Sequence, residues 1–477
     1  GAFDHRRNPG EVQLAVHPFA VVDVVGHHPQ ARLRGRGEGG EQQDNDEPAH
    51  TARISVMEAK PFGRRGFMGA ALAGAPAILK GMQAGSAIKV GLVGCGGRGT
   101  GAAAQALKAD DYAELAAMAD IDMERIDASI ARLQKAAAAK VKVDPDKKFV
   151  GLDAFQKVID AGVDVVLLAT PPGFRPQHLK YAIEQGKHVF CEKPVATDAP
   201  GVRSVLATSE LATKKNLSLV AGFCWRYSNY IRETFDQIKK GAIGDIVAYY
   251  ATYYTSPVKP MPPASTRPAG MSDVEWQIRN WYNFCWICGD SLVEQAVHSV
   301  DKVAWAFNDE PPISCVATGG RQIPAHGGDI YDHFSVNYLY ANDRRAFVSN
   351  RQIVGCYNEN ADYIMGTKGV CTIGRGPTPR ITGETNWTFQ GQRNDMYQAE
   401  HDALFASIRR GQPINDGKWM TTSTMLAMMG RMAAYTGQQI TWEQAMNSQE
   451  QLVPDKLDWN GSLPTRPVPQ PGVTKFV

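Results

Sequence analysis

One segment of the chain, residues 88–107, restricts the fold more than any other. It begins with a strand-like apolar run, Ile88–Val93, and ends with a helical run, Ala102–Leu107. The turn between them reads Gly94-Cys95-Gly96-Gly97-Arg98-Gly99. It matches G-x-G-x-x-G, in which the glycines permit a tight turn and let the backbone approach a pyrophosphate at the helix N-terminus. The hexapeptide alone is a weak signal, because any glycine-rich turn can match it.

A carboxylate follows the next expected strand. That strand, residues 114–119, ends at Asp120, 21 positions after Gly99. A carboxylate at this spacing is expected to accept hydrogen bonds from the adenosine ribose hydroxyls, which favours NAD over NADP. Asp122 is close enough to take that role instead. Arg98 could bind a 2′-phosphate, so NADP remains open.

Two further strands support the same architecture. Residues 163–170 form a continuous apolar run, as buried parallel strands do, and residues 188–191 lead into Glu192-Lys193-Pro194. Ligands of open parallel sheets bind beyond the carboxyl ends of the strands. The sequence therefore predicts an α/β protein with a Rossmann dinucleotide-binding domain over residues 87–222. The four strand ends carry Gly94, Asp120, Thr170 and Lys193.

Five motifs together resemble one family. They are GCGGRG (94–99), ATPP (169–172) followed by His178, GKHVFCEKP (186–194), AGFCWRY (221–227) and GDSLVEQAVHSVD (289–301). In these motifs the chain resembles the Gfo/Idh/MocA oxidoreductases, which include glucose–fructose oxidoreductase and inositol dehydrogenase. The resemblance runs from about residue 87 to residue 447.

The resemblance implies both an organisation and a cofactor site. The Rossmann domain is expected to be followed, over residues 223–450, by an α/β domain with a large, open, mostly antiparallel sheet that usually mediates dimers or tetramers. Residues 451–477 are predicted to be a tail on the surface or on a partner subunit. The lysine of the E-K-P motif, here Lys193, is implied to lie near the nicotinamide and the substrate hydroxyl. The residues expected to bind NAD or NADP are Gly94, Gly96, Gly97, Arg98, Gly99, Asp120, Thr170, Pro171, His178, Glu192 and Lys193.

Residues 289–307 are predicted to form one helix that edges a cleft. Ser291 and Glu294 match an S-x-x-E capping box, and an apolar stripe follows. The polar side chains share another face, because they are spaced at helical intervals. Glu294 could alternatively be only a cap, and Asp301 only a surface residue or a ligand between helices. The polar face comprises Glu294, His298, Asp301 and Trp305.

Three of these residues suit the oxidation of an alcohol, which requires a hydride acceptor and a base for the hydroxyl proton. A neutral histidine can take that proton at neutral pH, so His298 is the candidate base. Lys193 is its candidate partner, because an ammonium can orient the hydroxyl and stabilise a developing alkoxide. Glu294 is expected to orient the histidine or to bind substrate. Many members of the family have aspartate at this position, so the substrate could be held differently here.

The second domain adds candidate substrate contacts. Strands are predicted over residues 246–255, 334–340 and 346–353. An aromatic and amide-rich segment, residues 276–286, suits a sugar, because aromatic rings stack on its C–H faces and amides bind its hydroxyls. An aromatic packing cluster or a subunit contact is almost as well supported. The expected substrate contacts are Glu294 and His298, with Arg226, Asn280 and Trp281, and more weakly His401.

Charge and cysteine content argue against other functions. The 51 Lys and Arg against 49 Asp and Glu give a net charge of +2, which offers no reason to expect binding to nucleic acid or to an acidic membrane. Cys285 and Cys288 form a C-x-x-C, but no second pair or histidine completes a zinc site. Two buried thiols are favoured over a redox pair, and no metal is expected.

The N-terminal part, residues 1–86, is predicted to be a disordered extension followed by a Tat export signal. Residues 1–56 are polar and lack apolar periodicity. Arg64-Arg65 precede a short apolar run, residues 70–79, which is too short to span a bilayer. The protein is therefore expected in the periplasm or outside a bacterial cell. Since free NAD is scarce there, the cofactor is expected to be tightly bound.

The leading functional hypothesis is an NAD(P)-dependent oxidoreductase acting on a sugar or polyol hydroxyl. An alternative of the same fold is a redox-neutral enzyme that cleaves glycosides through a transient oxidation. A non-catalytic sugar-binding protein is a third possibility, which the joint presence of Lys193, Glu294 and His298 disfavours.

Overall fold

The structure is a computed structural model that describes residues 85–323 and 327–477. The predicted extension and export signal, residues 1–86, lie outside the described residues except for the last two. In the part of the chain that the structure describes, no helix combines the length and the apolar character needed to cross a membrane.

The first sheet is parallel throughout and has six strands, in the order β3-β2-β1-β4-β5-β6. This is the strand order of a dinucleotide-binding Rossmann sheet. Strand β4 is wholly buried, and β1 is buried at every residue except Lys89, which explains their apolar sequences. The strands are β1 Ile88–Val93, β2 Ala113–Asp120, β3 Lys148–Val150, β4 Val165–Leu168, β5 His188–Cys191 and β6 Leu219–Ala221.

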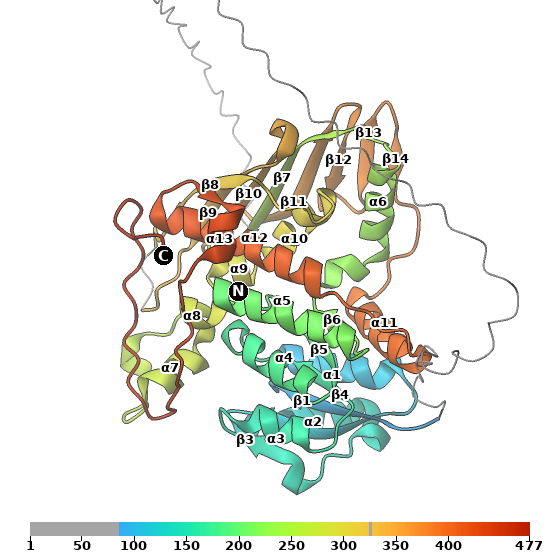
Figure 1. Ribbon diagram of the computed structural model, residues 1–477, viewed down its shortest axis with the longest axis vertical. Helices are drawn as coiled ribbons and strands as arrows, with labels where there is room; N and C mark the ends of the chain where they lie inside the picture. Colours follow the sequence, from blue (N-terminus) through green and yellow to red (C-terminus); the bar gives the residue numbers. More distant parts are fainter. Residues whose placement is uncertain (1–84, 324–326) are drawn as a thin grey trace, which may run out of the picture. The chain divides into compact units, whose positions relative to one another are not determined.

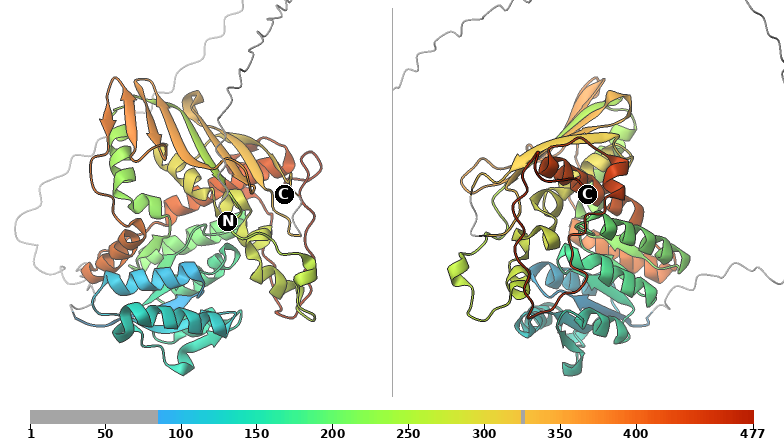
Figure 2. Two further views of the ribbon diagram at one scale, coloured as in Figure 1. Left: turned by 180° about the vertical axis from the view of Figure 1, so that it is seen from behind. Right: turned by 60° about the vertical axis from the view of Figure 1, so that its left-hand side comes forward.

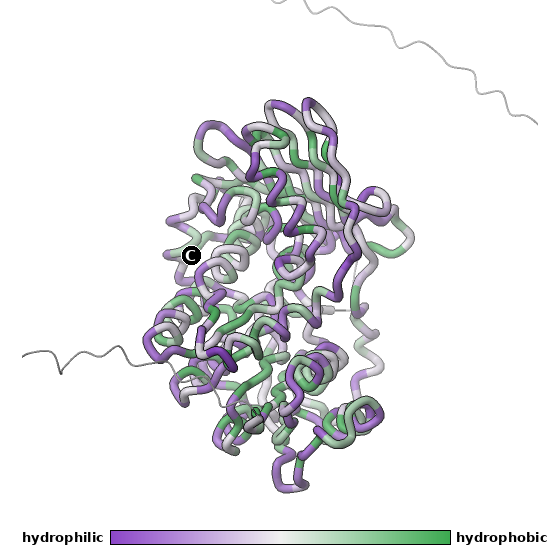
Figure 3. The backbone as a smooth tube through the Cα atoms, turned by 90° about the vertical axis from the view of Figure 1, so that its right-hand side faces the viewer, coloured by the Kyte–Doolittle hydropathy of each residue, from purple (hydrophilic) through white to green (hydrophobic). Residues whose placement is uncertain are grey.

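Helices cover both faces of this sheet (Figure 1). Apolar residues of α1 and α2 share one buried cluster with the strands, and those of α3, α4 and α5 belong to another. Hydrophobic and hydrophilic residues alternate along the helices, as amphipathic packing requires (Figure 3). The helices are α1 Gly97–Ala109, α2 Met123–Ala137, α3 Ala154–Asp160, α4 Arg175–Glu184 and α5 Ala199–Lys214.

A helix from the C-terminal part of the chain completes the Rossmann core. Helix α11, Met396–Arg410, buries Leu404, Phe405 and Ile408 in the same apolar cluster as α1. The Arg409 guanidinium Nε lies 2.7 Å from a carboxylate oxygen of Asp110, just after α1. The domain that the sequence assigned to residues 87–222 therefore includes a helix from far beyond that range.

The second sheet has nine strands, in the order β14-β13-β12-β11-β7-β10-β9-β8-β15. Only β7 and β10 pair in parallel, so the sheet is mostly antiparallel as expected. The predicted strand 246–255 is confirmed, and two others are shifted by one residue. The strands are β7 Ile246–Thr255, β8 Ser314–Gly320, β9 His333–Leu339, β10 Arg345–Gln352, β11 Glu359–Gly366, β12 Gly369–Ile373, β13 Arg380–Gly383, β14 Trp387–Thr388 and β15 Ile440–Thr441.

Helices lie against one face of this sheet, and the other face is open (Figure 2). Helix α12, which is buried on nearly all sides, lies between β8 and α5 and so joins the two domains. Its Met, Ala and Leu side chains are buried in this position, between the two domains. The remaining helices are α6 Asn229–Lys239, α7 Asp273–Arg279, α8 Cys285–Cys288, α9 Ser291–Glu294, α10 Val297–Ala306, α12 Gly417–Thr436 and α13 Trp442–Asn447.

The single helix predicted over residues 289–307 is wrong. The chain forms two helices, α9 and α10, separated by Gln295 and Ala296. The predicted capping box is also wrong, because Asp290 is the N-cap and its carboxylate accepts from the Ser291 amide. The Ser291 hydroxyl instead donates to the Tyr331 carbonyl and accepts from the Asn350 amide. The Glu294 side chain therefore does not take part in capping α9.

The C-terminal residues run along the chain's own surface beside α7 (Figure 1). Ser272 and Gln277 donate side-chain hydrogen bonds to the carbonyls of Trp459 and Leu463. The Asp273 carboxylate accepts from the Ser462 hydroxyl at 2.9 Å and from the Leu463 amide at 3.1 Å. These bonds fasten the tail to α7 within one chain.

Candidate active site

The glycine turn between β1 and α1 borders the cavity that we call the glycine-loop pocket. Gly94 has φ +97°, and a Cβ there would lie 2.7 Å from the Ala169 carbonyl carbon. A Cβ at Gly99 would lie only 1.8 Å from the Gly94 oxygen. Gly96 and Gly97 face open space instead. Packing thus requires glycine at positions 94 and 99. Gly96 and Gly97 leave the N-terminus of α1 accessible to an anion. The predicted residues that line the pocket are Gly94, Gly96, Gly97, Arg98, Gly99, Asp120, Thr170, Pro171 and His178.

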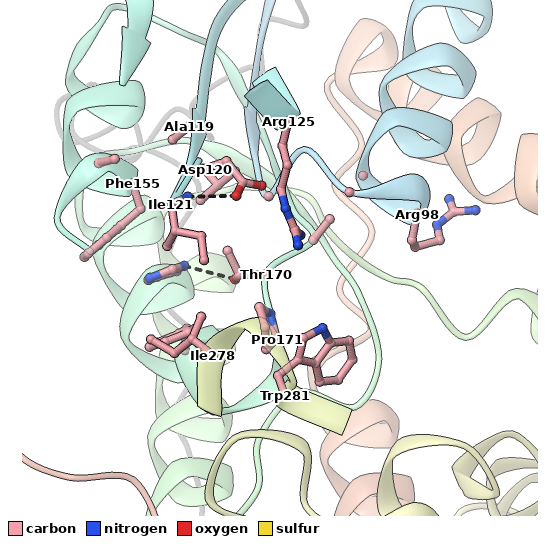
Figure 4. A pocket seen from close by; sticks show the side chains of 18 of the residues that line it. Arg98, Ala119, Asp120, Ile121, Arg125, Phe155, Thr170, Pro171, Ile278 and Trp281 are labelled. Carbon is pink, nitrogen blue, oxygen red and sulfur yellow. Dashed lines mark hydrogen bonds between the residues drawn. The ribbon is translucent and has the colours of Figure 1, made fainter. Parts of the chain in front are cut away.

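Asp120 lies at the end of β2 and lines this pocket (Figure 4). Its carboxylate accepts hydrogen bonds from the amides of Cys95 at 2.7 Å and Ile121 at 2.8 Å. The rival residue, Asp122, is used elsewhere: it caps α2 and lies 3.1 Å from Arg279. The structure therefore favours Asp120 over Asp122 as the carboxylate for a ribose.

The basic residue beside Asp120 is Arg125, and Arg98 points to the other side of the turn (Figure 4). Arg98 Nε lies 2.6 Å from the Glu192 carboxylate, and the guanidinium stacks over Tyr397. Arg125 was not among the residues predicted from the sequence. Its position in the first turn of α2 was a usable signal, because a cation there opposes the helix dipole.

Thr170, Pro171 and His178 line the pocket where β4 ends. The Thr170 hydroxyl lies 3.2 Å from His178 Nδ1, and the imidazole stacks on Phe155 at 4.0 Å between ring centroids. Burial, and then the charge of Arg175, lowers the pKa of His178 to about 3. His178 is therefore a neutral, fixed wall of the pocket.

The second domain covers the pocket from the opposite side. The residues that it contributes come from the loop after β7 and from α7 with the turn that follows; they are Lys259, Ile278, Arg279, Trp281 and Tyr282. We call this part the cover. Trp281, expected to contact substrate, lies in this wall and stacks on Tyr282 at 3.8 Å between ring centroids.

Lys193 and Glu294 are brought together where β5 ends. Lys193 Nζ donates to the Glu294 main-chain oxygen at 2.7 Å and to its Oε1 at 3.1 Å. The second carboxylate oxygen of Glu294 accepts from the Gln295 amide. Both side chains are largely buried, at 12% and 6% exposure. This ion pair fixes the ammonium group between the two domains.

His298 is the second residue of α10, and the charge of Lys193 acts on it. Burial, and then the charges of Lys193 and Lys302, lowers the pKa of His298 well below its usual value. Its Nδ1 is enclosed without a hydrogen-bond partner in the described part of the chain. His298 is therefore neutral at physiological pH, as a general base must be.

Two tyrosines lie near Lys193, Glu294 and His298, the three predicted catalytic residues, which we call the catalytic trio. The charge of Glu294, after burial, raises the pKa of Tyr282, which also lines the glycine-loop pocket. It likewise helps to raise the pKa of Tyr253 to about 12, and the Tyr253 hydroxyl donates to the Gln295 side chain at 3.1 Å. The catalytic trio thus lies next to the glycine-loop pocket and is not part of its lining. Sequence reasoning missed Tyr253, because on a buried strand face it looks like core.

Four predicted residues are held in other roles. The Arg226 guanidinium binds the carboxylates of Asp301 and Asp309. Asp301 is therefore a ligand between helices, and it also accepts from the Ser423 hydroxyl at 2.7 Å. Asn280 is buried and donates to the Trp276 carbonyl at 2.9 Å. His401 is fully buried against Phe190. These placements favour structural roles over contacts with substrate.

The cysteines offer no redox pair in the described residues. Cys285 and Cys288 are buried free thiols, and burial raises the pKa of both. No cluster of three or more potential metal ligands occurs within residues 85–323 and 327–477.

Residues 88–223 match the Gfo/Idh/MocA family, described as an oxidoreductase family with an NAD-binding Rossmann fold. The match covers the Rossmann domain alone. A cofactor of this type fits the pocket, since Gly96 and Gly97 leave a cradle that a Cβ would fill. The predictions of the fold class and of a nicotinamide dinucleotide are therefore confirmed.

Curated relatives of the chain include dehydrogenases. Inositol 2-dehydrogenase of Acidothermus cellulolyticus is 24% identical over 347 residues, which cover 71% of this chain and 90% of the relative. Trans-1,2-dihydrobenzene-1,2-diol dehydrogenase of Xenopus laevis is 27% identical over 214 residues. That match covers 45% of this chain and 56% of the relative.

Solved structures share the fold of both domains. Levoglucosan dehydrogenase in complex with NADH and levoglucosan has a TM-score of 0.60 and 17% identity, covering 75% of this chain and 99% of that one. Aldose-aldose oxidoreductase from Caulobacter crescentus has a TM-score of 0.59 and 18% identity, covering 74% and 99%. At these identities the likeness shows the fold alone.

Proposed function

We propose that the chain is an NAD(P)-dependent dehydrogenase that interconverts a sugar or polyol hydroxyl and the corresponding ketone. The observation that supports this most is the joint placement of Lys193, Glu294 and a neutral His298 beside the glycine-loop pocket. An alcohol dehydrogenase requires a donor to the hydroxyl oxygen and a base for its proton at such a position.

Lys193, His298 and Glu294 have different roles in the proposed reaction. When bound, the nicotinamide supplies the hydride acceptor. Lys193, fixed by its bonds to Glu294, donates a hydrogen bond to the substrate oxygen and stabilises the negative charge that develops there. His298 accepts the hydroxyl proton, since its lowered pKa keeps the ring unprotonated. Glu294 positions Lys193 and so sets where the hydroxyl must lie.

The substrate class rests on the relatives and on the site. Inositol and levoglucosan, which the names of relatives mention, are both polyhydroxylated rings. Glu294 and the hydroxyl of Tyr253 offer polar groups that suit such a ring. The extra methylene of Glu294, compared with aspartate, places its carboxylate further from its helix and would change which ring hydroxyl is held.

A panel of sugars, polyols and aryl glycosides, given to protein loaded with cofactor, tests this function. The expected product differs from its substrate by two hydrogens, measured as product mass together with nicotinamide absorbance. Release of phenol without net change in absorbance would instead establish the redox-neutral cleavage of glycosides. Tight binding of a sugar without turnover would establish a sugar-binding protein.

The pH dependence of the reaction follows from His298. Its lowered pKa means that the base stays unprotonated as the pH falls through about 6.5, the ordinary value for histidine. We expect kcat/KM to stay level through that pH and to fall only in more acid solution. An acid limb centred at or above pH 6.5 would contradict this. In the variant His298→Asn, the pH profile of the residual kcat/KM should have no acid limb.

The preference between dinucleotides depends on Asp120. Replacing it with serine removes a carboxylate that would repel a 2′-phosphate, while Arg125 remains in the pocket. We expect the affinity ratio of NADPH to NADH to rise by about 10–100-fold, measured by fluorescence titration. The matched variant Asp122→Ser, which keeps a capping side chain at the start of α2, should leave the ratio unchanged. An unchanged ratio in both variants would contradict the assignment of Asp120.

We also propose that two copies of the chain associate through the open face of the nine-stranded sheet. Apolar side chains on this face are exposed, and such patches mark interfaces. A buried lysine there would weaken association, so Phe347→Lys should lower the molar mass measured by light scattering. The patch comprises Val316, Phe347 and Val370, with Tyr250 and Tyr363 beside them.

The export of the protein, and with it a tightly held cofactor, remains our proposal. It rests on Arg64-Arg65 and the apolar run after them. Replacing both arginines with lysine should keep the protein in the bacterial cytoplasm, as measured by fractionation. Dinucleotide released on denaturing the exported protein would support retention, and its absence would refute it.

A further inference from the structure

Among the described residues, two basic side chains of the glycine-loop pocket have no carboxylate partner. Arg125 lies in the first turn of α2, and Lys259 lies in the loop after β7 on the cover. Within the described residues, neither has a carboxylate oxygen within 4.0 Å. Lys259 Nζ donates only to the Arg279 carbonyl, at 2.6 Å. Both positive charges therefore remain available to a ligand of the pocket.

The other charges of the pocket are already balanced. Arg98 pairs with Glu192 at 2.6 Å. Arg279 lies between Glu275 at 2.7 Å and Asp122 at 3.1 Å. Asp120 is the remaining carboxylate in the lining, so the pocket holds a surplus of positive charge. Burial, and then the positive charges of Arg125 and Arg279, lowers the pKa of Lys259.

The two cations come from opposite walls. Arg125 extends from the Rossmann domain beside Asp120 (Figure 4), whereas Lys259 belongs to the second domain. The ion pair between Asp122 and Arg279 joins the same two walls. An anion placed between the walls would neutralise both cations and hold the cover against the Rossmann domain. A nicotinamide dinucleotide carries such an anion in its phosphates.

We propose that Arg125 and Lys259 together bind a phosphate group of the dinucleotide, so that the cover closes on the cofactor through charge. This inference rests on the proposed function, which requires the dinucleotide in this pocket. The phosphate is either in the bridge between the two nucleosides or on the 2′-oxygen of NADP. Both offer the same oxygen acceptors, and Lys259 is a point charge that can serve either.

Binding measured without catalysis tests the proposal. The variants Arg125→Met and Lys259→Met remove the charge and keep an apolar stem, and Lys239→Met changes an exposed lysine on α6 outside the pocket. Dissociation constants for NADH and NADPH come from the fluorescence of the bound dinucleotide. We expect each of the two pocket variants to weaken binding by about tenfold, and Lys239→Met to bind like the unchanged protein.

Comparing the loss of affinity for NADH with that for NADPH shows which phosphate group the two cations bind. Equal losses for NADH and NADPH assign the cations to the bridging phosphates, and a loss confined to NADPH assigns them to the 2′-phosphate. Higher ionic strength should weaken binding to the unchanged protein more than binding to either pocket variant, because salt screens the missing attraction.

Three results would overturn the proposal. If both pocket variants bind as the control does, the cations have no role with the phosphates. If only Arg125→Met weakens binding, the cover is not part of the site. If the unchanged protein binds neither dinucleotide, the proposed function itself fails. Thermal unfolding of the variants without cofactor shows whether a loss of binding merely reflects a loss of folding.

Discussion

Replacing Lys193 with methionine is expected to lower kcat by about 10²–10⁴-fold. Methionine keeps the apolar stem but removes the ammonium that binds both the main chain and the carboxylate of Glu294. The substrate hydroxyl then loses its donor, and the developing negative charge is no longer stabilised. Steady-state kinetics on the substrate found by the sugar panel measures the effect.

The binding of NADH separates this role from a structural one. Lys193 does not line the glycine-loop pocket, so the dissociation constant for NADH should change by less than about threefold. The control Lys214→Met, at an exposed position near the end of α5, should match the unchanged protein in both measurements. A kcat of Lys193→Met within about threefold of the unchanged protein would refute the assigned role.

The second large effect is expected from a single methyl group at Gly99. In Gly99→Ala the new Cβ would lie 1.8 Å from the Gly94 oxygen, so the turn must deform. We expect a loss of about 1–3 kcal/mol in the free energy of unfolding and a loss of dinucleotide binding. Denaturant unfolding and fluorescence titration measure the two losses.

Gly96→Ala is the matched control for that experiment. It adds the same methyl group where φ is −68° and nothing lies within 4 Å, so stability should be unchanged. Binding should still weaken, because the methyl group enters the cradle at the N-terminus of α1. An unchanged stability of Gly99→Ala would contradict the packing argument.

The sequence analysis succeeded where local patterns decide the structure. Strand ends in a parallel sheet share one edge, so Gly94, Asp120, Thr170 and Lys193 could be grouped from the chain alone. The ion pair between Lys193 and Glu294 was not predicted, because 101 residues separate them. Side-chain contacts between residues so far apart produce no periodic pattern in the sequence.

The errors arose where tertiary contacts override a local pattern. Ser291 matched a capping box, but the bonds of Asp290 to the amides of Ser291 and Tyr331 fix the start of α9 instead. Arg98 lies in the glycine turn and lines the pocket as predicted, but its ion pair with Glu192 was not foreseen. Arg226 looked available because Asp301 and Asp309 are distant in sequence. Tyr331, Glu192 and the two aspartates that bind Arg226 are all remote in sequence from the residues that they hold.

The position of α11 has a consequence for how the chain folds. Because α11 covers part of α1, one apolar cluster of the nucleotide-binding half stays incomplete until the ribosome has made residues beyond 410. A fragment that ends at residue 222 would expose that apolar surface to water. The two halves should therefore melt in one cooperative transition, and a dinucleotide bound to one half should protect both from proteases.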